Sequence, residues 1–183
     1  MTSDLAVRSM VAFVDMSGLL AATDTFWRFM GQMSDVLTLG LAALGSAIGI
    51  GMAGQAAAGA WAKEAKAGRN PSFTYIILLS MPISQTLYAM IVMNKMQQVF
   101  AEAPEIAIAN AGAMFGIGFA TGAGEMLSAW MQGMIGAAGI RGLSESQGKG
   151  FGFLIIAMGV VETVGIFTMV FMLGMIPGIP AAG

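Results

Sequence analysis

Hydrophobic residues are concentrated in four stretches of the chain, at roughly 36–62, 73–94, 107–140 and 150–176. Each is long enough to cross a bilayer core about 30 Å thick, which takes about 20 apolar residues in a helix. Polar residues, Gly and Pro separate the stretches. The pattern predicts an all-α membrane protein with four transmembrane helices arranged as two helical hairpins, 36–97 and 107–176.

The two ends of the chain do not continue this pattern. Charged residues interrupt the apolar sequence of residues 1–35: Asp4, Arg8, Asp15, Asp24 and Arg28. We therefore predict an N-terminal extension that lies as an interfacial helix, with a disordered tail as the alternative, and a short C-terminal tail at 177–183. The acidic residues also fit a cleavable signal peptide poorly.

Basic residues are unevenly distributed among the connections. The second connection holds only Lys95, together with Glu102 and Glu105, whereas the first and third hold Lys63, Lys66, Arg69, Arg141 and Lys149. Because positive charge favours the cytoplasmic side, the loops 63–71 and 141–149 are predicted to be cytoplasmic in a multi-pass protein of the cell membrane.

The second hairpin repeats the first at a spacing of 77 residues. This shift aligns glycines and amides of the two halves: Gly45 with Gly122, Gln55 with Gln132, Gly59 with Gly136, Met81 with Met158 and Thr86 with Thr163. It also aligns Gln85 with Glu162. The agreement favours a duplicated hairpin. Small residues along the first span would let helices pack closely, either within one bundle or in a ring of hairpins.

Composition narrows the function further. Of 183 residues, 57% are hydrophobic and 10% charged, with no Cys and no His, which excludes disulfides, thiolate or imidazole metal sites and His-dependent catalysis. The net charge of −2 and scattered basic residues indicate no nucleic-acid partner. Gly148-Lys149-Gly150 is a turn and not a phosphate-binding loop, so we expect no ATP-hydrolysing site and no organic cofactor on this chain.

Glu162 is the feature that suggests ion chemistry. It lies about 12 residues into the fourth stretch, near the bilayer midplane, where an acidic residue costs about 2.5–3.5 kcal/mol to insert. We therefore predict that it carries a proton or a cation, with a purely structural protonated carboxyl as the alternative.

Uncharged oxygen donors are expected at the same depth as Glu162. They are Ser84 and Gln85 in the second span, Gln132 in the third, and Tyr88, three residues after Gln85 and able to reach the carboxylate. Pro82 frees nearby main-chain carbonyls. An all-oxygen shell with one carboxylate suits Na+ better than a divalent ion or a bare proton.

Glu125 is a second acidic residue within a span. It lies seven positions before Gln132 on the same helical face, about 10.5 Å further toward the outer surface. Two interpretations are open: Glu125 lines an ion path or a contact between protomers, or it is a protonated or partly hydrated glutamate between helices.

Four segments together resemble a known family. Residues 45–58, 81–88, 131–133 and 160–163 are similar to the proteolipid (the K or c subunit) of bacterial V-type sodium ATPases, and the resemblance covers about residues 38–176. It implies a rotor ring of many copies that carries Na+, or H+, past a stator subunit with an essential arginine. A central-stalk subunit would meet the cytoplasmic loops 63–71 and 141–149, and lipid would surround the ring.

The resemblance also assigns roles to residues. Glu162 corresponds to the ion-binding carboxylate, Gln132 and Gln85 to amide ligands, Met81 to a carbonyl ligand and Tyr88 to the hydroxyl that holds the glutamate. Ser84 stands where the sodium-carrying members have threonine, and Thr163 and Gln55 are taken as supporting residues. A proton-carrying ring and, from another class, a small tetraspan channel or transporter remain as alternatives.

Overall fold

The computed structural model describes residues 16–179, and these residues contain helices and no strand. Residues 1–15 of the predicted extension and residues 180–183 of the predicted tail lie outside this part. The elements in chain order are α2 (Met16–Lys66), α3 (Thr74–Ser80), the 3-10 helix η1 (Met81–Ile83), α4 (Ser84–Glu102), α5 (Pro104–Ala109), α6 (Ala111–Ser146) and α7 (Phe151–Met175).

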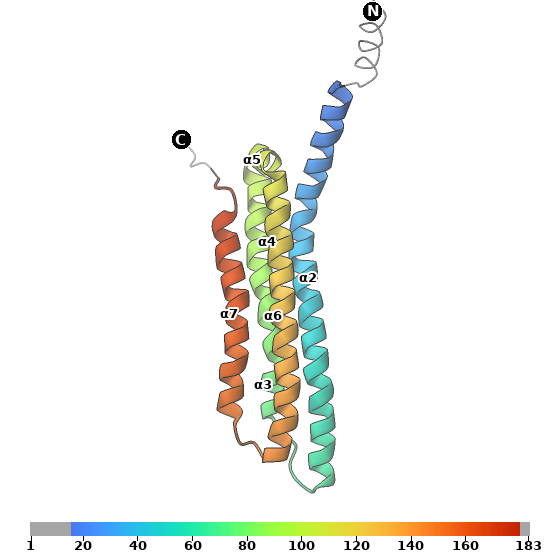
Figure 1. Ribbon diagram of the computed structural model, residues 1–183, viewed down its shortest axis with the longest axis vertical. Coiled ribbons are helices and arrows are strands. Elements are labelled where there is room, and N and C mark those ends of the chain that lie inside the picture. The colour runs from blue at the N-terminus through green and yellow to red at the C-terminus, as the bar shows by residue number, and fades with distance from the viewer. Residues whose placement is uncertain (1–15, 180–183) are drawn as a thin grey trace, which may run out of the picture.

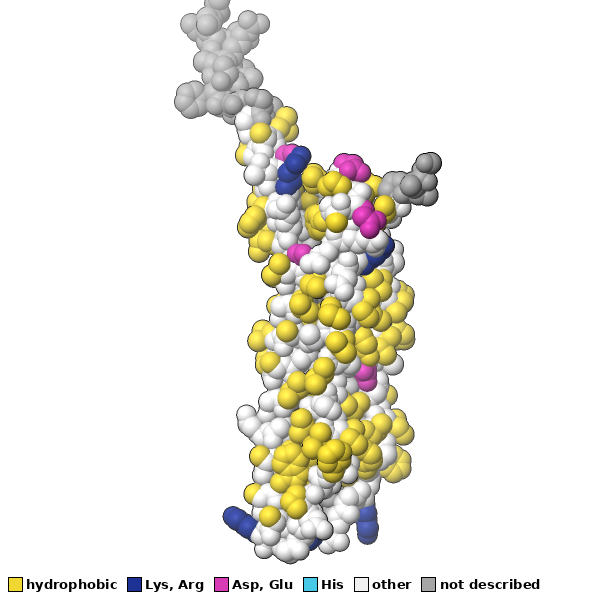
Figure 2. Space-filling model, turned by 180° about the vertical axis from the view of Figure 1, so that it is seen from behind, with side chains coloured by type: hydrophobic (Ala, Val, Ile, Leu, Met, Phe, Trp, Pro, Cys, Tyr) yellow, Lys and Arg dark blue, Asp and Glu magenta, His cyan; other side chains and the backbone are white. Residues whose placement is uncertain are grey.

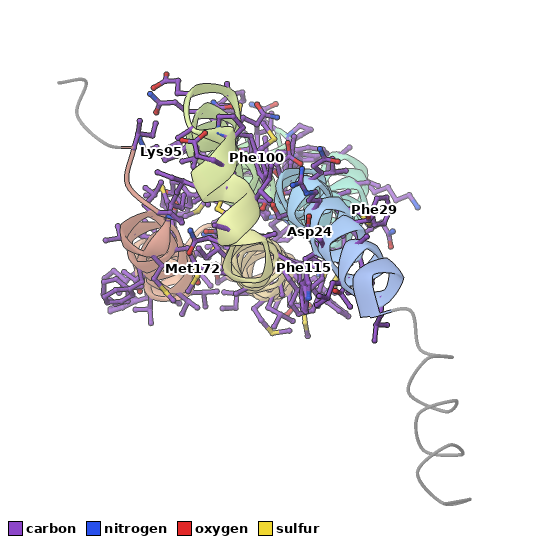
Figure 3. All side chains as sticks on the ribbon, turned by 90° about the horizontal axis from the view of Figure 1, so that it is seen from above. Asp24, Phe29, Lys95, Phe100, Phe115 and Met172 are labelled. Atoms are coloured by element: carbon purple, nitrogen blue, oxygen red, sulfur yellow. The ribbon has the colours of Figure 1, made fainter. Side chains whose placement is uncertain are left out.

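The helices form an elongated bundle (Figure 1). α2 and α6 run down its length, and the chain returns through α3, η1 and α4 and then through α7. Seen along the bundle axis, α2 and α7 lie on opposite sides, with α4 and α6 between them (Figure 3). The described residues thus form two helical hairpins, α2 with α3–α4 and α6 with α7.

Two helix boundaries differ in position from the sequence pattern. α2 continues without a break through residues 35 and 36, and its N-terminal part extends beyond the α5 turn (Figure 1). α6 continues to Ser146, so the turn before α7 is shorter than the polar stretch 141–149. That turn is tight because Gln147, Gly148 and Gly150 have positive φ angles of 56°, 87° and 93°.

Pro82 interrupts the run of helix from α3 to α4. It lies in the first turn of η1, which separates α3 from α4. A proline cannot donate a main-chain hydrogen bond and its ring displaces the preceding turn, so a short 3-10 segment is the expected local structure. The break lies immediately before Ser84 and Gln85, and it therefore sets how these two side chains enter the bundle.

α2 and α6 approach closely because glycine lies at their contact. A Cβ atom on Gly133 would overlap the main chain of Gly49 on α2. Small residues at such a crossing let two helix backbones pack by dispersion contacts, which is how helices associate where lipid gives no hydrophobic drive. The predicted role of small residues in close packing is therefore seen in the contact of these two helices.

The loop between α2 and α3 is fixed by a buried carboxylate. Glu64 accepts hydrogen bonds from Tyr75 Oη and from the main-chain N–H of Ser72, the latter at 2.9 Å. Trp61 Nε1 donates to the Ser72 carbonyl at 2.7 Å. These bonds hold the end of α2 against the start of α3.

The lateral surface of the bundle is largely hydrophobic (Figure 2). α7 presents a stripe of exposed side chains spaced three or four residues apart: Phe153, Ile156, Val160, Val164, Phe167 and Phe171. Within the described residues three helical stretches are long and apolar enough to cross a membrane: Gly18–Lys66, Thr74–Glu102 and Phe151–Met175. α6 is rich in glycine and lies against all of them.

Candidate ion-binding site

The register of α6 against α7 places the centre of the site. Gln132 Nε2 donates to the Met158 carbonyl at 3.3 Å, and Ser128 Oγ donates to the Val161 carbonyl at 3.0 Å. These two hydrogen bonds join two successive turns of α6 to two successive turns of α7 and so fix the position of one helix along the other. Glu162 follows Val161 directly, so its level along the bundle is that of Ser128.

Tyr88 and Glu162 are joined across two helices. Tyr88 Oη on α4 donates to Glu162 Oε1 at 2.8 Å, and both side chains are half-buried in the chain. Glu162 lies close to the middle of the 25-residue α7. Figure 2 shows acidic atoms at mid-height on an otherwise largely hydrophobic surface. Glu162 is partly exposed, whereas Glu125 has no exposed surface.

A chain of polar side chains runs from α4 to α6 at the same level. Ser84 Oγ donates to Gln85 Oε1 at 3.2 Å, and Gln85 Nε2 donates to Gln132 Oε1 and to Ser128 Oγ, each at 3.2 Å. Gln85 and Gln132 are fully buried. Within the described residues no hydrogen bond joins Glu162 to either glutamine, although the carboxylate and the amides lie at nearly the same level.

Met81 contributes its main-chain carbonyl to this region. The oxygen accepts the N–H of Ser84 and lies 3.0 Å from the Ser84 hydroxyl, whose single proton it shares with Gln85 Oε1. The 3-10 turn around Pro82 thus directs the Met81 carbonyl toward Ser84. The structure brings Met81, Ser84, Gln85 and Gln132 into one connected set, with Tyr88 and Glu162 as a hydrogen-bonded pair beside it.

The charge of Glu162 has no balancing basic residue among the described residues around it. Glu162 is the only charged residue of α7, and neither ion pair of residues 16–179, Arg28 with Asp24 and Lys63 with Glu145, involves it. An acidic side chain in hydrocarbon needs a proton, a partner or a cation. Oxygen donors close to such a carboxylate are the ligand type that hard monovalent cations accept.

Thr163 and Gln55, which the sequence suggested as supporting residues of the ion site, make no hydrogen bond to its other side chains among the described residues. The Thr163 hydroxyl is exposed and donates to the Val160 carbonyl, because consecutive helical residues point in different directions. Gln55 is exposed on α2 and lines a cavity with Lys63, Arg141 and Glu145. The repeat aligns Gln55 with Gln132, but α2 is at the edge of the bundle and α6 is inside it.

Ser128 is the residue of this region that sequence reasoning missed. It accepts a hydrogen bond from Gln85 and donates one to Val161, so it connects α4, α6 and α7. Its spacing gave a usable signal, since it lies four residues before Gln132 and three after Glu125 on one helical face.

Glu125 lies one turn beyond Ser128 and is fully buried. Neither of its carboxylate oxygens has a hydrogen-bond partner among the described residues. Gly165 of α7 is beside it: a Cβ atom there would come within 2.6 Å of Glu125 Oε2. The side chain therefore occupies the interior between α6 and α7, where the lack of a side chain on Gly165 leaves room for it.

The sequence also matches a family model. The model for the C subunit of ATP synthase matches residues 36–94 and 115–175, once for each hairpin. The two matched segments cover the Tyr88–Glu162 pair and the polar chain from Ser84 to Gln132. No curated protein matches the chain significantly.

Proposed function

Because this chain belongs to the ATP synthase c-subunit family, we propose that it is a rotor-ring subunit that carries Na+ by reversible binding at Glu162. The family forms membrane rotor rings that work with the other subunits of an ion-translocating ATP synthase or ATPase. α2, the run from α3 through α4, α6 and α7 would then be the four transmembrane spans. The two hairpins that they form would be a duplication of one hairpin. One ion-binding carboxylate for each pair of hairpins agrees with the V-type proteolipid that the sequence resembles.

The observation that carries the proposal is the Tyr88–Glu162 hydrogen bond beside the connected amides. The hydroxyl donor favours the ionised carboxylate, and Ser84, Gln85, Gln132 and the Met81 carbonyl supply neutral oxygens at nearly the same depth. One carboxylate with neutral oxygens gives a neutral complex with a monovalent cation and a charged one with a divalent cation. A proton would need only the carboxyl and one acceptor.

Movement of the ion follows from the charge of Glu162. Bound Na+ neutralises the carboxylate, which lets the site pass the lipid-facing arc of the ring at low electrostatic cost. An arginine of a stator subunit would then stabilise the empty carboxylate and promote release. The exposed hydrophobic stripe of α7 fits a helix whose outer face meets lipid or a neighbouring protomer.

The loops at one end would meet the central stalk. In the view of Figure 2 the end that carries the α2–α3 and α6–α7 turns shows dark blue basic side chains and no acidic ones, whereas the opposite end shows side chains of both kinds. By the positive-inside rule we assign the end with loops 63–71 and 141–149 to the cytoplasm of the cell. ATP hydrolysis would belong to other subunits.

The test is protection of Glu162 from a hydrophobic carbodiimide, which attacks protonated carboxyls. In membranes held at one pH, rising Na+ should reduce the labelling of Glu162, because the bound ion excludes the proton. K+ at equal concentration is the control for ionic strength. Labelling that does not change with Na+ at neutral pH would refute Na+ binding and favour H+.

The ring itself is tested separately by native mass measurement of the detergent-solubilised protein. A large homo-oligomer is expected. A monomer or a small oligomer in mild detergent would contradict the ring and favour a tetraspan channel or transporter.

A further inference from the structure

Glu125 is the strongest feature that the proposed ion cycle does not use. Its side chain has no exposed surface, and both carboxylate oxygens lack hydrogen-bond partners among the described residues. An isolated ionised carboxylate in such a place is far more costly than a neutral carboxyl, because burial removes the water that stabilises charge. The state of this group is therefore a question separate from that of Glu162.

The fold makes specific room for the carboxyl. A Cβ atom at position 165 would lie 2.6 Å from Glu125 Oε2 and 3.3 Å from Ser128 Oγ. Any larger residue at Gly165 would thus fill the space that the carboxyl and the Ser128 hydroxyl now occupy. The absence of a side chain at this one position of α7 is therefore what allows α6 to carry a buried acid there.

No basic group of the described residues is placed to neutralise an ionised Glu125. α2 has no charged residue between 36 and 62, and the titratable groups that α4 and α7 bring to this level are the Tyr88 hydroxyl and the Glu162 carboxyl. Lys95 is seven residues beyond Tyr88, which lies near the level of Glu125, so it is about 10 Å further along the helix, and it donates to Gln98. A negative Glu162 would further oppose a negative charge on Glu125.

The surroundings also fail to provide a shell for a metal cation. Na+ in a protein is held by several oxygens, whereas neither oxygen of Glu125 has a hydrogen-bond partner among the described residues that would mark a set of polar ligands around it. A proton needs only the carboxyl. The surroundings of Glu125 therefore suit H+ and not Na+.

We propose that Glu125 is a second cation-binding carboxyl of the chain, which holds its own proton while the cation at Glu162 exchanges. The proton forms an O–H bond to one carboxylate oxygen and leaves the side chain neutral. Of the two interpretations of Glu125, the proposal adopts the protonated glutamate between helices and not the ion path. The inference holds whether Glu162 binds Na+ or H+.

The test uses infrared spectroscopy of the assembled protein in lipid at neutral pH. A protonated carboxyl has a C=O stretching band that is distinct from the bands of a carboxylate, and labelling with 13C-glutamate shifts it. The Glu162→Gln variant should keep such a band, equal to about one carboxyl per chain, and added Na+ should not change it. The band should disappear in the Glu162→Gln/Glu125→Gln variant.

Matched variants keep the result interpretable. Glu162→Gln/Glu102→Gln changes an exposed acid and should leave the band unchanged, whereas Glu162→Gln/Glu125→Asp should move the band to the frequency of a protonated Asp. The Asp variant gives the answer if the double Gln variant does not assemble. The proposal is overturned if the Glu162→Gln variant has no protonated band, if Na+ removes the band, or if the band survives loss of Glu125. Failure of Na+ protection at Glu162 would refute the proposed function and leave this result intact.

Discussion

Removal of the Tyr88 hydroxyl tests the contact on which the proposed ion site depends. In Tyr88→Phe the donor to Glu162 Oε1, now at 2.8 Å, is lost while the ring keeps its packing. Without this donor the ionised carboxylate is less favourable relative to the protonated one. Na+ binds only the ionised form, so it should compete less well against a proton.

The size of the effect follows from the kind of hydrogen bond. A hydrogen bond to a charged group contributes about 1.5–3 kcal/mol, and because both side chains are half-buried we take the lower end, about 1.5 kcal/mol. Since about 1.4 kcal/mol corresponds to a tenfold change in an equilibrium constant, the Na+ concentration for half-protection should rise roughly tenfold. The assay is carbodiimide labelling of Glu162 at a fixed pH across a series of Na+ concentrations.

The chain offers a matched control, because Tyr75 is its other tyrosine and also donates to a carboxylate, Glu64. That pair joins the end of α2 to the start of α3, away from Glu162, so Tyr75→Phe should leave half-protection of Glu162 unchanged. Equal values for wild type, Tyr88→Phe and Tyr75→Phe would show that the Tyr88 contact does not contribute to ion binding, and the reasoning would fail.

Three further changes test the charge, the polar chain and the packing. Glu162→Gln should abolish ATP-driven ion uptake into vesicles that contain the whole complex, because no carboxylate remains to bind the ion; uptake at the wild-type rate would contradict the assignment. Ser128→Ala leaves a donor of Gln85 without its acceptor, at a cost of about 1–3 kcal/mol, and should weaken Na+ protection several-fold; an unchanged protection curve would place Ser128 outside the site. Gly133→Val should lower the thermal stability of the solubilised assembly by about 1–3 kcal/mol or more, whereas Gly142→Ala, with open space around its Cβ position, should not; equal melting temperatures would show that the close contact of α2 and α6 is not needed.

Much of the helical arrangement could be predicted from the sequence because the bilayer imposes length and apolarity on every span. The hairpins and the contact of small residues follow from these rules and from the repeat. The exact helix ends do not: α2 continues through 35–36 and α6 to Ser146 because polar residues at a membrane surface are compatible with helix. Hydropathy indicates where the chain passes from lipid to water, and a helix can continue beyond that point.

Helical spacing predicts only those parts of the candidate site that lie on one face of one helix. Spacing gives which residues share a face, and this was enough to group Ser84, Gln85 and Tyr88. It does not give how one helix is rotated against the next, which is why spacing alone does not single out Ser128 and why the alignment of Gln55 with Gln132 does not place Gln55 in the site. The repeat relates positions within two hairpins, but the neighbours of α2 and α6 differ, and neighbours decide what a side chain contacts.

Two acidic residues one helical turn apart in level are given different chemistry by their surroundings. Glu162 has a hydroxyl donor, neutral oxygens nearby and partial exposure on the side of the bundle, and these features favour the cation exchange that we propose there. Glu125 has no hydrogen-bond partner among the described residues and no exposed surface, and its carboxyl occupies the space that the missing side chain of Gly165 leaves. Exchange requires both a stabilised charge and access, and only Glu162 has both. The amino acid is the same at the two positions, so the proposed difference between an exchanging ion at Glu162 and a resident proton at Glu125 would come from the neighbours that α4 and α7 place around each carboxyl.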